Sequence, residues 1–108
     1  MQDWPDREHC TAEDLVQIIR ILRDPETGCP WDKVQTHASI RKNFLEETCE
    51  ALEAIDADDA DMLREELGDV LMQVAFHVVL EEERGRLNFE QVLRGPECWY
   101  KQLGCAQK

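Results

Sequence analysis

Basic residues are scarce in this sequence, and their scarcity excludes a class of partners. The chain has 12 lysines and arginines against 24 aspartates and glutamates in 108 residues, which gives a formal net charge of −12 at pH 7. This charge repels the phosphate backbone of DNA or RNA and leaves no basic stripe to follow it. We therefore expect no nucleic-acid polymer as a partner. An acidic chain that binds a phosphorylated ligand needs a divalent cation between the two sets of negative charges.

Other features of common protein classes are also missing. No apolar run reaches the roughly 18 residues of a membrane span, and residues 1–5 lack the basic and apolar regions of a signal peptide. The five cysteines are odd in number, scattered and without a CxxC spacing, which argues against a disulfide framework and a zinc site. We therefore expect a soluble, cytoplasmic protein that makes no membrane contact.

The length and the punctuation of the chain indicate its fold class. A chain of 108 residues has room for one core, so we treat residues 1–108 as a single domain. Glycine and proline divide it into helical segments, and almost no alternating apolar pattern suggests strands. These patterns predict an all-α fold, a bundle of four or five helices.

Local signals place the ends of the first two helices. Thr11 can cap a first helix, which must end before the loop predicted over residues 25–32. A second helix is predicted to run from about Thr36 or Ser39 to Ile55. Each of these starts has a hydroxyl side chain that can accept a hydrogen bond from a free backbone N–H group.

The third helix is predicted to follow the acidic stretch of residues 56–59, one of which can cap it, and to stop at Gly85. It would be about 25 residues, or roughly 38 Å, long. A short fourth helix capped by Asn88 comes next. Residues 70–80 of the third helix are apolar nearly all round, whereas a helix at the edge of a small bundle shows one apolar stripe. We therefore expect a second subunit to cover this helix, which predicts a homo-oligomer.

Two acidic pairs occupy corresponding positions in the second and third helices. At about 100° per residue, Glu47 falls on the apolar face of its helix, with Glu50 about 60° to one side. Glu66 and Asp69 repeat this arrangement in the third helix. Negative charges that face one low-dielectric space cannot all stay ionised without compensation. Carboxylate oxygens are the ligands that Mg²⁺ and Mn²⁺ prefer, so the pattern predicts a metal site.

The same spacing is compatible with other interpretations. The acids could be solvated helix surface, which is how we interpret the run of residues 81–83. They could also pair with arginines in a purely structural helical protein. A di-iron site requires Glu-x-x-His pairs, and no histidine stands three residues after a glutamate in either helix. The redox interpretation is therefore weakened.

The acidic motifs resemble those of a known family. Glu46, Glu47 and Glu50, followed by Glu66 and Asp69, are similar to the EExxE…ExxD signature of MazG-type nucleoside triphosphate pyrophosphohydrolases. Two such motifs in this order are more specific than either one alone.

The segments that flank the motifs resemble the same family. Residues 22–36, which contain the sequence Gly-Cys-Pro-Trp-Asp, are similar to the loop before the signature, and residues 83–89 are similar to its continuation. The resemblance covers roughly residues 15–93. The tail of residues 94–108 departs from the family pattern, which commonly continues into another helix and a basic end.

The resemblance implies an all-α NTP pyrophosphatase fold, assembled as dimers or tetramers. It implies that Mg²⁺ is bound by the residues matching Glu47, Glu50, Glu66 and Asp69. In the implied reaction a nucleoside triphosphate is cut into monophosphate and pyrophosphate, and Glu46 or Glu47 helps to deprotonate the attacking water. A role in cleansing the nucleotide pool is implied by analogy. Because of the divergent tail, the alternative is a non-catalytic helical dimer that binds metal and nucleotide.

Three further residues are candidates for substrate contacts. The indole of Trp31 could stack on a base, although a tryptophan between a proline and a helix start is more often a packing residue. Lys33, in the loop that resembles the family, could bind the outer phosphates. Gln73 lies one turn beyond Asp69 and could contact the substrate or a metal ligand. We interpret His77, on the same stripe, as a hydrogen-bonded core residue.

Overall fold

The regular elements of the computed structural model, which describes residue 8 and residues 10–95, are all helical. In chain order they are α1 (Ala12–Leu22), the short 3₁₀ helix η2 (Asp32–Val34), α2 (His37–Asp56), α3 (Ala60–Glu83) and α4 (Phe89–Arg94). This part of the chain contains no strand, which confirms the all-α prediction. None of its helices combines the length and the apolar character needed to span a membrane.

Each α-helix begins at a side chain that caps it. The side chains of Thr11, Thr36 and Asn88 each accept a hydrogen bond from a backbone N–H three residues on. In return, the backbone N–H of each donates to the side chain of that later residue, which completes a capping box. The side chain of Asp59 likewise accepts a hydrogen bond from the backbone N–H of Met62 and caps α3. The helix starts predicted from these residues are confirmed, and the second helix begins after Thr36 and not at Ser39.

A tight turn reverses the chain after α3. Gly85 has a φ of 68°, in the left-handed region that glycine occupies without the steric cost of a Cβ atom. This confirms Gly85 as the predicted stop. The turn brings the chain back to α3, where the backbone N–H of Arg86 donates to the carbonyl of Glu81 over 3.1 Å.

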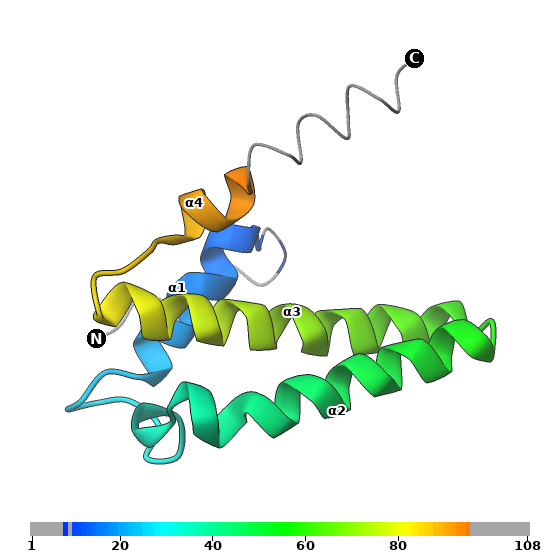
Figure 1. Cartoon of the computed structure of the whole chain (residues 1–108), viewed down its shortest axis with the longest axis horizontal. Helices are drawn as coiled ribbons and strands as arrows, with labels where there is room; N and C mark the ends of the chain where they lie inside the picture. Colours follow the sequence, from blue (N-terminus) through cyan, green and yellow to red (C-terminus); the bar gives the residue numbers. More distant parts are fainter. Residues whose placement is uncertain (1–7, 9, 96–108) are drawn as a thin grey trace.

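The long helices α2 and α3 lie side by side as an antiparallel hairpin (Figure 1). Helices α1 and α4 pack against the C-terminal half of α3, so the core sits at that end of the hairpin. The buried core residues are Val16, Ile19, Ile40, Ala75, Phe76, Val78, Val79, Leu80 and Phe89. Among the described residues, no third helix covers the other half of the hairpin (Figure 1).

This uncovered half, which we call the far half of the hairpin, leaves large apolar side chains in solvent. Leu52 and Ile55 on α2 are 54% and 55% exposed, and Leu67 and Leu71 on α3 are 51% and 49% exposed. Leu45, on α2 just before the far half, is 64% exposed. The spacings i, i+7, i+10 on α2 and i, i+4 on α3 place each set on one stripe of its helix. One chain alone therefore leaves this part of the hairpin uncovered. By contrast, residues 75, 76 and 78–80, which we expected a second subunit to cover, are buried within the chain.

Candidate metal centre

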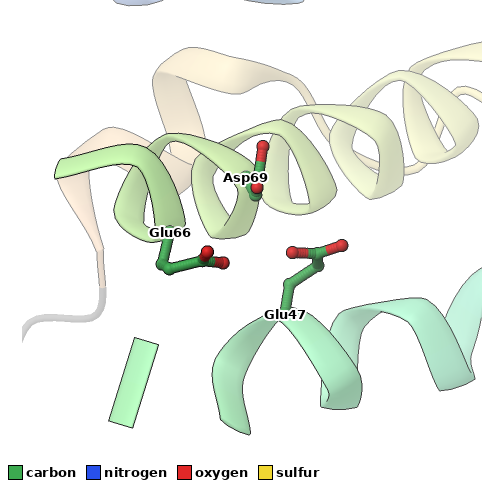
Figure 2. A group of neighbouring side chains, drawn as sticks. All are labelled: Glu47, Glu66 and Asp69. Carbon is green, nitrogen blue, oxygen red and sulfur yellow. The ribbon is translucent and has the colours of Figure 1, made fainter. Parts of the chain in front are cut away.

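Three of the four predicted metal-binding carboxylates come together between α2 and α3. Glu47 projects from α2 toward α3, Glu66 projects from α3 toward α2, and Asp69 lies on α3 beside them (Figure 2). One carboxylate oxygen from each lies within 4.8 Å of those of the other two. Ligand atoms on opposite sides of one Mg²⁺ are about 4.2 Å apart. Small side-chain movements would therefore let a single cation contact all three.

The geometry of the hairpin explains this convergence. Glu66 and Asp69 are three residues apart, so they are neighbours on the surface of α3. The antiparallel pairing of the helices sets Glu47 opposite them. Ala51 and Ala54, the next inward positions of α2, are 6% and 0% exposed. Their small side chains allow the two helix axes to approach closely beside the carboxylates.

The environment of these carboxylates disfavours negative charge. The Oε2 atoms of Glu47 and Glu66 are buried and have no hydrogen-bond partner in the described part of the chain. A hydrogen bond with the carboxyl group of Glu50, together with burial, raises the pKa of Glu66 to about 6. Burial, and then the charges of Glu50 and Asp69, raise the pKa of Glu47. A cation would supply the missing partner and would favour the ionised forms.

The other two acidic candidates are more exposed than Glu47 and Glu66. Glu50 lies at the edge of the cluster, exposed to solvent but close enough to Glu66 to share a hydrogen bond. Glu46 is exposed, and its carboxylate oxygen lies 3.7 Å from the ammonium nitrogen of Lys42, one turn earlier on α2. Glu50 thus lies beside the three converging carboxylates without belonging to their group, and Glu46 faces solvent.

The two loop candidates occupy a different part of the molecule. The Lys33 ammonium group donates to the carbonyl of Pro25 over 3.3 Å, and Lys33 lines a cavity of about 710 Å³ between α1, the loop and the end of α3. None of the four predicted metal ligands lines this cavity. Trp31 is 54% exposed. Packing within one chain therefore covers less than half of Trp31, and its proposed stacking role stays a prediction.

Two polar side chains extend the stripe of Glu66 along α3. Gln73 and His77 follow it at i+7 and i+11, which places all three on one face of the helix. The Oε1 atom of Gln73 and the Nε2 atom of His77 are buried without a partner among the described residues. The other ring nitrogen of His77, Nδ1, lies 2.6 Å from Nδ1 of His37. This contact confirms His77 as a hydrogen-bonded, partly buried residue.

Glu81 is a residue that the sequence interpretation places wrongly. It belongs to the run of residues 81–83, which we expect to be solvated, yet it is 8% exposed. Its carboxylate accepts two hydrogen bonds from the guanidinium of Arg86, at 2.6 and 2.7 Å, and lies 2.6 Å from Nε2 of His37. These bonds lower the pKa of Glu81 to about 2. The i, i+4 spacing of His77 and Glu81 is the sequence signal for this network.

The remaining members of the run pair with α1 and its C-terminal cap. The Glu82 carboxylate accepts two hydrogen bonds from Arg20, at 3.0 and 2.9 Å, and Glu83 accepts two from Arg23, at 2.7 and 2.8 Å. The sequence predicts only solvated surface at these two positions. In the structure, both side chains fasten α1 to α3. Bidentate pairs of this kind give the contact a defined geometry.

The raised pKa of Glu66 predicts how metal-free stability depends on pH. The folded protein holds a proton on Glu66 up to about pH 6, above the ordinary value of 4.5. The ionised carboxylate of Glu66 therefore destabilises the folded state fully above pH 6, and this effect disappears as the pH falls toward 4.5. Glu66→Gln, which removes the charge, should raise the free energy of unfolding most at about pH 7.5 and least near the acidic limit.

Urea unfolding of metal-free protein checks this difference. The exposed neighbour Glu65→Gln is the matched control, because it removes the same charge outside the cluster; it should leave the pH dependence of the parent in place. Equal unfolding free energies for the parent and Glu66→Gln at every pH would show that the carboxylates do not strain the metal-free fold.

Comparison with known proteins identifies the family of this chain. The family model of the MazG nucleotide pyrophosphohydrolase domain matches residues 35–96, which is more than half of the chain and contains both acidic motifs. The chain belongs to this family. The expectation drawn from the motifs is therefore confirmed.

Individual relatives agree with the family match. The chain is 51% identical over 82 residues to a Thermotoga maritima protein named nucleoside triphosphate pyrophosphohydrolase/pyrophosphatase MazG, a match that covers 76% of this chain and 32% of that protein. It is 53% identical over 78 residues to the Escherichia coli K12 nucleoside triphosphate pyrophosphohydrolase, covering 72% of this chain and 30% of the relative. The matched part thus spans about a third of these curated relatives.

Proposed function

We propose that this chain hydrolyses ribonucleoside or deoxyribonucleoside triphosphates to the corresponding monophosphate and pyrophosphate. The proposed cofactor is Mg²⁺ or Mn²⁺. The observation that carries the proposal is the convergence of Glu47, Glu66 and Asp69 between α2 and α3. The names of relatives about 50% identical to the chain support the reaction type. A housecleaning role in the nucleotide pool and a cytoplasmic location belong to the same proposal and rest on the resemblance and the sequence.

The donor set fits a hard divalent cation. All the donors are carboxylate oxygens, and two of them, on Glu47 and Glu66, are buried without a partner. Glu47, Glu66 and Asp69 would hold the ion, and Glu50 would complete the set from the edge. When bound, Mg²⁺ would neutralise the triphosphate and lower the pKa of a water molecule. The cluster also provides the bridging charge that a chain of net charge −12 needs for a polyanionic substrate.

Glu46 and Glu47 are the two glutamates proposed to accept a proton from the attacking water. Glu47 lies within the carboxylate cluster, so it would be close to a water molecule beside the ion. Glu46 would act from the solvent side, beside Lys42. In the proposed reaction the water oxygen bonds to the α-phosphorus, the bond to the bridging oxygen breaks, and pyrophosphate leaves while the water proton passes to the carboxylate.

The proposed substrate contacts have unequal support. Gln73 is partly buried one turn beyond Asp69, and its buried Oε1 atom has no partner among the described residues, which suits a hydrogen bond to substrate. The exposed indole of Trp31 is available for stacking on a base. Lys33 lines a separate cavity in one chain. For Lys33 to bind the outer phosphates, its loop would have to move, or the loop of a second copy would have to reach the site.

We also propose that copies of the chain associate, as a dimer or tetramer, through the far half of the hairpin. Its exposed leucines and isoleucine form stripes on both helices, and contiguous apolar patches of this kind mark protein interfaces.

Light scattering should give at least twice the mass of one chain, and the double variant Leu52→Glu with Leu71→Glu should have the mass of the monomer. Val34→Glu is the control, because Val34 is 68% exposed but lies in η2. A monomeric, folded parent would contradict the proposal.

Product analysis tests the proposed reaction. The chain is incubated with each common nucleoside triphosphate, with and without Mg²⁺, and the products are separated. We expect monophosphate and pyrophosphate when Mg²⁺ is present; diphosphate and orthophosphate would contradict the proposal. The second candidate is a non-catalytic helical dimer that binds metal and nucleotide, an alternative that the divergent sequence of residues 94–108 favours. Residues 96–108 of that tail lie outside the part of the chain that the structure describes. Nucleotide binding without release of any phosphate would select it.

A further inference from the structure

A hydrogen-bonded chain that the proposed reaction does not use joins the start of α2 to the end of α3. The Glu81 carboxylate, held by Arg86, lies 2.6 Å from Nε2 of His37, and Nδ1 of His37 lies 2.6 Å from Nδ1 of His77. The two imidazole planes are within 5° of parallel. The ring of Phe44 lies against His77, with centroids 5.5 Å apart. The network connects residues 37 and 81, which are 44 apart in sequence.

The chemistry of these groups limits where protons can lie on the two histidines. The ionised carboxylate of Glu81 can accept but not donate, so Nε2 of His37 must carry a hydrogen. If His37 is neutral, its Nδ1 is a bare acceptor, and Nδ1 of His77 must donate to it. Nε2 of His77 is then left without a hydrogen, and this is the buried atom that has no partner. If His37 is instead charged, Nδ1 of His77 must be bare.

In either arrangement the bond between the two Nδ1 atoms contains one hydrogen. When both rings are protonated, each Nδ1 carries a hydrogen, and two donors face each other across 2.6 Å. Protonation of both histidines is therefore incompatible with this contact. The consequence follows from the geometry of the pair and does not depend on which ring takes the proton first.

The surrounding charges make a second proton still less favourable. Arg84 and Arg86 approach from the end of α3 and the turn after it, and Arg41 follows His37 by one turn of α2. Arg23, at the end of α1, donates to the carbonyl of Gln35 just before α2. Among residues 10–95, Glu81 is the acid that contacts the histidine pair. Glu82 and Glu83 are engaged by Arg20 and Arg23.

We propose that a pH-sensitive clamp is formed by Glu81, His37 and His77. The clamp fastens the start of α2 to the end of α3 while the two histidines share one hydrogen. It opens when both rings are protonated. Burial and the charge of His37 lower the pKa of His77, in agreement with this. The clamp goes beyond the proposed hydrolysis, because its residues are not among the carboxylates assigned to the metal.

The sign of the effect follows from linkage. The unfolded chain binds protons on histidine at about pH 6.5, whereas the folded state resists the second one. The unfolded state therefore holds more protons below that pH. The contribution of the clamp to the free energy of unfolding is complete above about pH 6.5 and is lost as the pH falls below that value. The lowered pKa of Glu81 affects stability in a lower pH range. The stability that ionised Glu81 contributes is lost as the pH falls from 4.5 to about 2.

Nitrogen-15 NMR of the imidazole rings tests the clamp directly in the intact chain. Near neutral pH we expect His37 to carry its hydrogen on Nε2 and His77 on Nδ1, with a scalar coupling between the two Nδ1 atoms across the hydrogen bond. Acidification should remove that coupling as the second ring is protonated. Fast exchange between tautomers on both rings, without the coupling, would overturn the proposal even if no variant folds.

A double-mutant cycle supplies the second test. His37→Gln, His77→Gln and the double variant are unfolded in urea between about pH 7.5 and about pH 5.5. The parent should lose stability relative to the double variant as the pH falls, and the coupling between the two positions should shrink in parallel. Carboxylates at the metal centre titrate equally in all four proteins, so they cancel. A coupling that stays constant with pH, or is absent throughout, would contradict the clamp.

Discussion

Replacing Glu66 by glutamine should remove most of the Mg²⁺-dependent release of pyrophosphate. Glu66 supplies one of the three converging carboxylates and has a buried oxygen without a partner. The amide keeps the size of the side chain but removes the charge that would balance the cation. Loss of an outer partner of a metal ligand typically costs about 10–100-fold, so loss of a ligand should cost more. Initial rates at increasing Mg²⁺ and substrate concentrations give the change in kcat/KM.

Two other glutamate variants set the scale for this result. Glu65→Gln, on the exposed face of α3 beside Glu66, should retain activity. Glu46→Gln should lower kcat more than it weakens Mg²⁺ binding if Glu46 acts on the water and not on the ion. Equal losses for Glu65→Gln and Glu66→Gln would mean that the converging carboxylates have no special role in the reaction.

Mg²⁺ should also stabilise the folded chain strongly. A ligand that binds the folded state alone raises the free energy of unfolding by about 2.7 kcal/mol at 100 times its dissociation constant. Glu47, Glu66 and Asp69 are brought together by folding, so the unfolded chain offers no comparable site. Binding would in addition balance the negative charge of a cluster in which a hydrogen bond with Glu50, burial and the neighbouring carboxylates raise the pKa of Glu66. Thermal unfolding with increasing Mg²⁺ should show a rising midpoint.

The same titration on Glu66→Gln supplies the control. This variant should start from equal or greater metal-free stability, because one repelling charge is gone, and should gain much less from Mg²⁺. A parent whose midpoint does not respond to Mg²⁺ would favour the interpretation in which the inward acids are purely structural.

The features that could be predicted from sequence are those set by short spacings. Thr11, Thr36 and Asn88 cap helices through groups three residues away, so their role is written in the local pattern. Glu47, Glu66 and Asp69 were placed on inward faces by the helical repeat alone. The repeat could give the direction of each side chain but not its distance from the opposite helix, which depends on how closely α2 and α3 pack.

The features that were missed depend on contacts between distant segments. Glu81 looks like one member of a solvated acidic run, but the turn at Gly85 returns Arg86 to it, and His37 reaches it from α2. Lys33 belongs to the loop that resembles the family, yet its ammonium group bonds to the carbonyl of Pro25 within that loop. A helical period cannot show such contacts, because it describes one element at a time.

The position of water attack tests the central claim most directly. The chain is allowed to turn over a nucleoside triphosphate with Mg²⁺ in ¹⁸O-labelled water, and the products are examined by mass spectrometry. Attack at the α-phosphorus predicts that the label appears in the nucleoside monophosphate and that pyrophosphate, the leaving group, carries none. Label in orthophosphate, with nucleoside diphosphate as the other product, would place the attack at the γ-phosphorus and contradict the account.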